Sequence, residues 1–511
     1  MRPLLIAICA GFWGCIFVDP FPEVAPDRTS NVPTVTDAAA ETVDAATDGC
    51  DGDRCAPLKA TQWSAFIASS ASFESAGFIA ADPTRGVVLA ASGEGNWTAG
   101  GSPVLPAKDR DVGLLFVSDG AIQSAKRLDF GGREIVDEVA FAEGGAVWVS
   151  GIGAIEGSQI HPLVRKIDAM SASTASAAID SADATSQLRC SSVAVKGAFV
   201  AIGCTGRGTI TFTRPDDSTG SLTTDGSDDA FVARLDENTG RVVWARRFGG
   251  ESSDVVSAVA VDAQGDVYVA GRFESVSLSP LALTRVGTRA NAFVARLRAI
   301  DGSSVWAMRY GDSVDPPILG QGESSTMSAR KGVLANAIAL DGKGNVVIGG
   351  AYRGTVDFGG AATQADAPGF YVLCSDAATG ARRWSKVGRG PAEHGGSVSH
   401  VAFDDSGHIA VSGSVLGKPL GTFDNRSFAI GGLVTAFSAK LASKDGLVES
   451  VRSFVGSTAT ARVFGVGAGF GAKGETLVGL EVPGPTTIDL GTVKVNAAPG
   501  LAGVVAWVDE P

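Results

Sequence analysis

The chain has 511 residues, 67 of them glycine, and only 19% of its residues are charged, below the roughly 25% of an ordinary soluble domain. This composition is typical of strand-rich folds with many tight turns. The formal net charge of −13 and the lack of any basic stripe argue against a nucleic-acid partner, because a phosphate-binding surface needs clustered lysine and arginine.

The first segment, residues 1–15, has the pattern of an export signal. Its apolar run, Leu4–Trp13, is too short to span a bilayer. The run ends in Gly14-Cys15, which resembles the lipobox of bacterial lipoproteins, and this resemblance implies lipidation of Cys15. Simple export without a lipid is the alternative, because the residues before Gly14 are bulkier than is usual in a lipobox.

Residues 16–60 are predicted to be a disordered acidic linker. They contain five prolines and nine acidic residues against three basic ones. A segment of this composition cannot bury a core, and its negative charges repel one another. Cys50 and Cys55 bracket a short acidic turn, which we expect a disulfide to close in an oxidising compartment. Calcium is the less favoured alternative for this turn, because the regular ligand spacing and terminal glutamate of a calcium loop are missing.

Residues 61–511 are predicted to form one domain built from an internal repeat. The clearest unit opens at Ala230 with AFVARLDENTGRVVWARRFGG and continues to Gly271. Related units open at Ala292, Gly369 and Ala436. Each unit begins with two alternating strands around a glycine-containing turn. A second, almost continuously apolar hairpin follows, which predicts burial on both faces, as in the inner strands of a propeller.

The turn of this second hairpin ends in a glycine that can be counted along the chain. The glycines recur 52 to 79 residues apart, enough for four strands and loops, at Gly86, Gly145, Gly197, Gly265, Gly344, Gly407 and Gly474. We expect a positive φ at these positions. The aspartates three residues earlier, Asp262, Asp341 and Asp404, are predicted to hydrogen-bond the turn backbone.

Two cysteines flank one of these turns. Cys190 and Cys204 each lie seven residues from Gly197, which predicts that they are cross-strand neighbours joined by a disulfide. Two buried free thiols are the alternative.

The ends of the chain each hold half of one unit. Residues 62–68 match the VVWARRF strand, and residues 503–509 match the AFVARLD strand. The predicted fold is therefore all-β: a seven-bladed β-propeller with four-stranded blades, whose ring is closed by the N- and C-terminal strands in one blade.

The repeat pattern AFVARLD, TGRVVWARRFGG and SDVVSAVAVDAQGDVYVAG resembles the SBBP (seven-bladed β-propeller) repeats of bacterial surface and secreted proteins. The match is close over residues 228–312, recognisable over 335–460 and degenerate over 61–205. The resemblance implies an extracytoplasmic propeller with a binding or scaffolding role, and it carries no catalytic residues over to this chain.

A second resemblance lies in Leu235–Trp244 and Ser375–Trp384. Both segments look like the tryptophan-docking motif of quinoprotein dehydrogenases, in which the tryptophan of each blade packs against the next blade. The resemblance implies that role for Trp63, Trp244, Trp306 and Trp384, as large flat side chains buried between sheets. A quinone enzyme is disfavoured because the sequence has no adjacent Cys-Cys pair. A non-catalytic, lipid-anchored propeller of the outer-membrane assembly type is a further alternative.

Residues suited to catalysis are sparse. The four histidines, His161, His394, His400 and His408, form no metal-spaced pair and no recognisable triad. We interpret His400, in an inner strand, and His408, in a turn, as structural.

Loop lengths point to one candidate binding rim, because function on such scaffolds lies in the loops. The connection 312–332 is far longer than its counterpart 249–254, and the connection 389–397 follows it in the ring. The candidate ligand-contacting residues of these two loops are Asp312, Asp315, Glu323, Arg330, Arg389, Glu393 and His394. Two surface loops without function are the alternative.

The sequence thus predicts a non-enzymatic extracytoplasmic propeller for binding or scaffolding, secreted or held at the outer membrane or cell surface by a lipid at Cys15. We expect a monomer with a protein or glycan ligand, and we assign no catalytic, cofactor or metal residues. The alternative is an enzyme on the propeller scaffold, of the quinone oxidoreductase, lyase or glycosidase type. Ionisable side chains that converge at the channel mouth with perturbed pKa values would favour the enzyme.

Overall fold

The computed structural model describes residues 61–70, 73–82, 84–99, 102–106, 110–157, 159–168, 173–311, 332–359, 363–390, 395–417, 420–490, 494–497 and 500–507. The predicted signal, the linker and Cys15, Cys50 and Cys55 lie outside these residues. Apart from the single 3-10 turn Glu143–Gly145, the described segments are strands, turns and loops. None of them forms a helix that could cross a bilayer. The fold is therefore all-β.

Most strands belong to antiparallel meanders of four strands, and each meander takes the name of its first strand. The β2 meander contains β2 (Phe73–Asp82), β3 (Gly86–Gly93), β6 (Asp111–Ser118) and β7 (Ala121–Leu128). The β8 meander contains β8 (Ile135–Phe141), β9 (Val147–Glu156), β10 (Gln159–Ile167) and β11 (Ser173–Ser176). The β13 meander contains β13 (Gln187–Lys196), β14 (Phe199–Arg207), β17 (Asp229–Asp236) and β18 (Val242–Phe248). A single parallel pair, Ile160 with Gln187, joins the last two meanders into one sheet.

The second half of the chain continues in the same way. The β19 meander contains β19 (Asp254–Val261), β20 (Val267–Phe273), β23 (Asn291–Leu297) and β24 (Ser304–Tyr310). The β25 meander contains β25 (Val333–Leu340), β26 (Asn345–Val356), β27 (Thr363–Asp376) and β28 (Arg382–Arg389). The β29 meander contains β29 (Gly396–Phe403), β30 (His408–Leu416), β33 (Val434–Ala442) and β34 (Val448–Phe454). The β35 meander contains β35 (Phe464–Phe470), β36 (Thr476–Val482), β39 (Gly500–Trp507) and β1 (Thr61–Ser69).

Short strands extend or decorate the meanders. β4 (Asn96–Ala99) and β5 (Ser102–Pro106) continue the sheet beyond β1, and β31 (Leu420–Phe423) and β32 (Arg426–Ala429) continue it beyond β28. β12 (Ile179–Ser181), β15 (Thr209–Thr213) and β16 (Thr219–Thr223) form a separate small sheet. Two further hairpins are β21 (Ser277–Leu278) with β22 (Leu283–Thr284), and β37 (Thr486–Asp489) with β38 (Lys494–Ala497).

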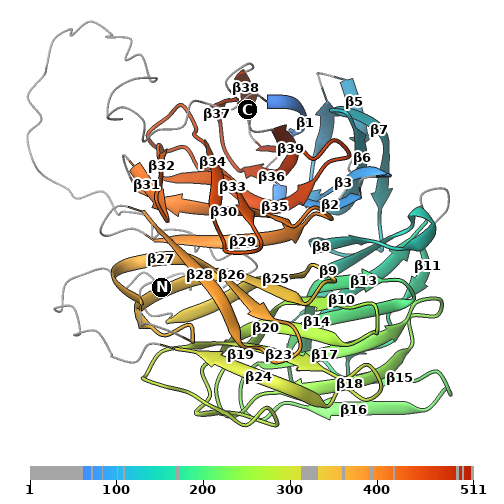
Figure 1. Cartoon of the computed structure of the whole chain (residues 1–511). Helices are drawn as coiled ribbons and strands as arrows, with labels where there is room; N and C mark the ends of the chain where they lie inside the picture. Colours follow the sequence, from blue (N-terminus) through green and yellow to red (C-terminus); the bar gives the residue numbers. More distant parts are fainter. Residues whose placement is uncertain are drawn as a thin grey trace, which may run out of the picture.

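The meanders follow one another in chain order, and the first strand of each packs against the first strand of the next. The same contact joins β35 to β2, although they come from opposite ends of the described chain. Strand β1 pairs with β39 along its whole length, so the blue and red ends of the chain lie side by side (Figure 1). Both ends of the described chain therefore contribute strands to one sheet.

Local backbone chemistry explains the turn between the first and second strands of each meander. All of the counted turn glycines have a positive φ, between 59° at Gly197 and 105° at Gly344, a conformation that costs glycine little. Asp262 accepts backbone hydrogen bonds from Gln264 and Asp266 at 3.0 and 2.9 Å. Asp341 and Asp404 make the equivalent bonds in their own turns. Both predictions about these turns are confirmed.

Tryptophans connect successive meanders. The indole nitrogens of Trp244, Trp306 and Trp384 donate to backbone carbonyls in the next meander, of Ala299, Ala377 and Ser443, at 2.8, 3.1 and 2.7 Å. The packing between successive sheets predicted for these three residues is confirmed, although only Trp244 and Trp384 are buried, with 5% and 8% exposed, and Trp306 and Trp63 are partly exposed.

A glycine makes room for each indole. A Cβ added at Gly302, Gly380 or Gly446 would lie 2.6, 2.8 or 2.5 Å from the ring that covers it. At Gly120 the nearest atom would be Trp63 Cβ, 3.0 Å away. A tryptophan and a glycine therefore also meet between the β35 and β2 meanders, but through the Cβ atom of Trp63 and not through its ring.

Candidate functional site

In every meander, the first strand has a β-bulge at the equivalent position of its pairing with the second strand. The unpaired residues are Gly77, Asp137, Ser191, Ser257, Asn336, Ser399 and Val466. A bulge leaves one residue outside the ladder and turns its side chain away from the regular pleat. Most of these residues are polar, so the innermost strands present polar groups where the meanders meet.

Several bulge residues form bonds to the following meander. Asp137 forms an ion pair with Arg189, and the Asp137 side chain is fully buried. Ser191 Oγ donates to the carbonyl of Val256 at 3.2 Å. Asn336 Nδ2 donates to the carbonyl of Val398 at 3.1 Å. The bulges therefore connect neighbouring sheets near their innermost edges.

A second set of bonds runs from the second strand of a meander to the next bulge. Ser92, Thr205 and Ser414 accept the amide hydrogens of Val136, Val256 and Gly465 at 3.2, 3.3 and 3.2 Å. In each case the donor is the residue immediately before the bulge. The corresponding position of the β35 meander is Glu481, whose carboxyl group accepts the amide hydrogen of Ala76.

Burial raises the pKa of Glu481 to about 8, although its hydrogen bond with Ala76 acts in the opposite direction. A carboxyl group with this pKa is mostly protonated at neutral pH. Glu481 therefore introduces a titratable group at the junction between the first and last parts of the chain.

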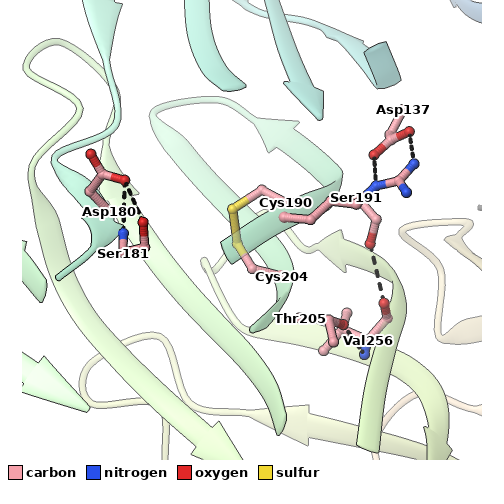
Figure 2. Close-up of a disulfide and its surroundings, with 9 residues drawn as sticks. Asp137, Asp180, Ser181, Cys190, Ser191, Cys204, Thr205 and Val256 are labelled. Atoms are coloured by element: carbon pink, nitrogen blue, oxygen red, sulfur yellow. Dashed lines mark hydrogen bonds and ion pairs between the residues drawn. A yellow bond between two sulfur atoms is a disulfide. The ribbon is translucent and has the colours of Figure 1, made fainter. Parts of the chain in front are cut away.

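The disulfide lies beside the interface between the β13 and β19 meanders. Cys190 and Cys204 are opposite each other in the β13–β14 register and are joined by a disulfide. Figure 2 shows this bond next to Ser191 and Thr205, which both point toward Val256 of the following meander. The bond connects the two strands whose side chains hold β19 in place. Its position identifies it as structural.

One ionisable pair connects meanders that do not follow each other in the chain. His400 of β29 and Glu138 of β8 are 262 residues apart in sequence, yet Nε2 of His400 lies 3.3 Å from Oε2 of Glu138. The ring of Phe78, on β2, meets the His400 ring edge-on with centroids 6.0 Å apart. All three residues directly follow the bulge of their strand. The bulges therefore bring side chains from three meanders together.

Several polar atoms on the strands of this pair and on their neighbouring strands are buried and have no partner. Among the described residues, no partner is found for His400 Nδ1 or for the hydroxyl groups of Ser150, Ser399 and Ser412. Ser150 is directly opposite Glu138 in the sheet, and Ser412 is directly opposite His400. Buried polar groups are normally satisfied by protein, water or ligand. We call His400, Glu138, Ser150, Ser399 and Ser412 the central cluster.

The central cluster has limited chemical means. A carboxylate next to an imidazole can bind a cation or exchange a proton. No group of three or more His, Cys, Asp or Glu side chains within the described segments is arranged to hold a metal ion.

The other described histidines and the most buried acids have structural partners. His161 pairs with Asp180 at 2.8 Å, and His408 pairs with Asp404 of its own turn at 2.8 Å. Asp254 fixes a connecting loop by accepting the amide hydrogens of Gly250, Glu274 and Ser275. These groups stabilise turns and loops.

Asp229, at the start of β17, is a similar case. Burial raises its pKa to about 6. Arg247 lies 2.9 Å away, and the Asp225 amide also donates to the Asp229 carboxyl group. Asp229 is therefore a buried carboxyl group that holds the start of β17.

Six of the seven predicted rim residues lie outside the described part of the chain. Asp312, Asp315, Glu323, Arg330, Glu393 and His394 lie outside the described residues. Arg389 is described: it is the exposed last residue of β28, and its backbone pairs with Gly369 and Thr422. The rim therefore stays a prediction.

Sequence reasoning did not single out the central cluster. Glu138 and His400 each lie seven residues before the turn glycine of their hairpin, at Gly145 and Gly407. The other five hairpins have an apolar residue, a cysteine or a glycine at this offset: Ile79, Cys190, Ala258, Ala337 and Gly467. Comparing the hairpins residue by residue would have revealed that only Glu138 and His400 place an acid or a histidine at this position.

Comparisons with known proteins give the chain no family. No family model matches it, and no curated protein matches it. Among solved structures, it is similar to a quinohemoprotein alcohol dehydrogenase from Comamonas testosteroni, with 12% identity, 89% of this chain and 78% of that chain covered, and a TM-score of 0.39. The WD40 β-propeller domain of Doa1 has 9% identity, coverage of 86% and 96%, and a TM-score of 0.35. A subtype N10 neuraminidase-like protein of A/little yellow-shouldered bat/Guatemala/060/2010 has 8% identity, coverage of 87% and 99%, and a TM-score of 0.33.

Proposed function

We propose that this chain is a closed, seven-bladed β-propeller that serves as a binding scaffold for a protein or glycan outside the cytoplasm. Each meander is one blade in this proposal, and the β35 meander is the blade to which both ends of the chain contribute. The observation that carries the proposal is the pairing of β1 with β39. Sharing a blade between the chain ends is a way to remove exposed sheet edges.

Two further contacts support closure. A Cβ at Gly120 of the β2 meander would lie 3.0 Å from Trp63 Cβ of β1. Glu481 accepts the Ala76 amide hydrogen as Ser92 accepts that of Val136. If the β35 and β2 meanders are neighbouring blades, both contacts join positions that also meet at the other interfaces. A scaffold held together in this way leaves its loops free to vary and to carry the binding surface.

The proposed binding surface is the rim formed by loops 312–332 and 389–397. The lengths of these connections support the assignment, because the equivalent connection 249–254 needs only six residues. In the same proposal, export by residues 1–15 and lipidation of Cys15 place the propeller on a membrane surface, with residues 16–60 as the tether.

The test compares the parent chain with a variant lacking residues 314–331. Both are expressed on the cell surface and examined by proximity labelling of neighbouring proteins and by binding to an array of defined glycans. The proposal predicts that the variant keeps the parent's thermal unfolding midpoint and loses its partner. Shortening the exposed β15–β16 turn at residues 215–218 serves as the control and should leave binding intact. Unchanged partner binding after the 314–331 deletion would place the binding surface elsewhere.

A further inference from the structure

The sequence contains two acceptor motifs for N-linked glycosylation. This motif is Asn-x-Ser/Thr, in which the middle residue is not proline. Of the eight asparagines in the chain, only Asn96, in Asn-Trp-Thr, and Asn425, in Asn-Arg-Ser, begin such a motif. Because so short a motif also arises by chance, its place in the fold decides what it means.

Both motifs lie on hairpins that extend a sheet outward. β4 and β5 continue the β35 meander beyond its fourth strand, β1, and β31 and β32 continue the β25 meander beyond its fourth strand, β28. Among the described residues, no other meander continues past its fourth strand in this way. Asn96 is the first residue of β4, and Asn425 lies in the turn between β31 and β32. The two motifs therefore coincide with the two added hairpins.

Strand alternation points the first motif toward solvent. Its middle residue, Trp97, is 1% exposed and meets the Phe73 ring edge-on, with centroids 5.1 Å apart. Successive side chains of a strand point to opposite faces, so Asn96 is exposed and Thr98 is partly exposed. The Asn96 backbone is held by Ser70, whose Oγ accepts its amide hydrogen at 2.9 Å. The side-chain amide of Asn96 has no hydrogen-bond partner within the described chain.

The second motif begins at the tip of its hairpin. Asp424 and Asn425 form the two-residue turn, and Asp424 has φ 52°, as tight hairpin turns require. Asp424 donates its amide hydrogen to the carbonyl of Val387 on β28 at 2.9 Å. Asn425 is exposed, and its side-chain amide is also without a partner in the part of the chain that is described. Both acceptor amides therefore lie on a fixed backbone with their side chains free.

Each added hairpin creates a new sheet edge. No described strand pairs with the outer side of β5 or β32, and such an edge presents N–H and C=O groups that can pair with another chain. β5 contains Pro103 and Pro106, which cannot donate a ladder hydrogen bond, but β32 has no proline. A glycan is bulky and solubilising, so a glycan on each hairpin would keep other chains away from both edges.

We propose that Asn96 and Asn425 carry N-linked glycans that shield the outer edges of β5 and β32. The inference rests on the export that the proposed function assigns to residues 1–15, because these glycans are added outside the cytoplasm. In the transfer, Nδ2 of the asparagine forms a bond to C1 of the first sugar of a lipid-linked oligosaccharide. The bond from C1 to the lipid pyrophosphate breaks, the pyrophosphate leaves, and one Nδ2 proton passes to a base of the transferase.

The test expresses the full chain in a host that N-glycosylates exported proteins, once with its own residues 1–15 and once with an established export signal in their place. Mass spectrometry of the intact protein before and after a peptide N-glycosidase counts the glycans. The parent should carry two glycans, Asn96→Gln and Asn425→Gln should each lose one, and the double variant should lose both. Thr98→Ala keeps Asn96 but removes the hydroxyl group that the motif needs, and it should lose the same glycan as Asn96→Gln.

The matched control is Asn238→Gln, which changes an exposed asparagine that begins no motif; it should keep both glycans. Shielding is measured by light scattering: the enzymatically deglycosylated parent should associate at a concentration at which the glycosylated parent stays monomeric. In the protein exported by its native source, the peptides that contain Asn96 and Asn425 should carry sugar.

A parent that carries no glycan under the established signal, or unmodified Asn96 and Asn425 in the natively exported protein, would overturn the proposal. Equal association with and without glycans would overturn the shielding role. Glycans that appear only under the established signal would support the two acceptor sites and contradict export by residues 1–15.

Discussion

The indole nitrogen of Trp384 donates a 2.7 Å hydrogen bond to the carbonyl of Ser443, and the indole ring covers Gly446 of the next meander. The backbone at Gly446 has φ +72°, and a Cβ there would lie 2.5 Å from the ring. This contact connects a local turn conformation to the packing between two sheets. It is repeated by Trp244 over Gly302 and by Trp306 over Gly380.

Gly446→Ala is expected to lower the free energy of unfolding by about 2–4 kcal/mol. About 1 kcal/mol of this comes from the left-handed backbone, and the rest from forcing a methyl group into the indole. The matched control is Gly342→Ala, which has φ +67° and no atom within 4 Å of the added Cβ, so only the backbone cost applies. Urea unfolding of both variants gives the difference. Equal losses would mean that the indole contact contributes nothing.

Stability should fall as the pH rises, because of Glu481. Its pKa is raised from 4.5 to about 8 in the folded protein, so between these values the folded state binds more protons than the unfolded state. The contribution of this protonated carboxyl group is complete below pH 4.5 and is lost as the pH passes 8. Urea unfolding is measured at pH 5, 7 and 9. The free energy of unfolding of Glu481→Gln should increase relative to that of the parent as the pH rises.

The control for the pH series is Glu156→Gln, which alters an exposed carboxylate. It should follow the parent across the whole range. A Glu481→Gln profile parallel to that of the parent would contradict the assigned role of Glu481.

The disulfide between Cys190 and Cys204 is expected to contribute about 3 kcal/mol, the value for a loop of this size. The parent should lose this amount in a reducing agent, and the Cys190→Ala/Cys204→Ala variant should lose it permanently and no longer respond to the agent. Cys374→Ala removes the buried free thiol and should keep the parent's response. A parent that unfolds identically with and without reductant would show that the bond contributes nothing.

Lipidation is predicted at Cys15. Cells expressing the parent chain and fed with labelled palmitate should yield a labelled protein, and Cys15→Ala should remove the label while Cys9→Ala keeps it. Label remaining on Cys15→Ala, or absent from the parent, would contradict the anchor and favour simple export.

The sequence allowed accurate prediction of features that depend on neighbouring residues. A turn glycine such as Gly265 is recognisable because its positive φ and the nearby Asp262 follow from local backbone chemistry. The docking of Trp244 could be predicted because the same motif recurs at Trp384. The pairing of His400 with Glu138 could not, because it depends on the strands carrying them approaching each other, although they belong to units 262 residues apart. The junction at Glu481 depends likewise on where the last unit meets the first.

Closure of the ring is the central claim, and a crosslink between the chain ends tests it most directly. Ala65 of β1 is the register partner of Val504 of β39. In the Ala65→Cys/Val504→Cys variant, mass spectrometry of unreduced peptides should find a disulfide within one chain. The control Ala65→Cys/Val269→Cys pairs β1 with the distant strand β20 and should leave the new thiols free. Free thiols at 65 and 504, or a crosslink only between chains, would contradict a ring closed by β1 and β39.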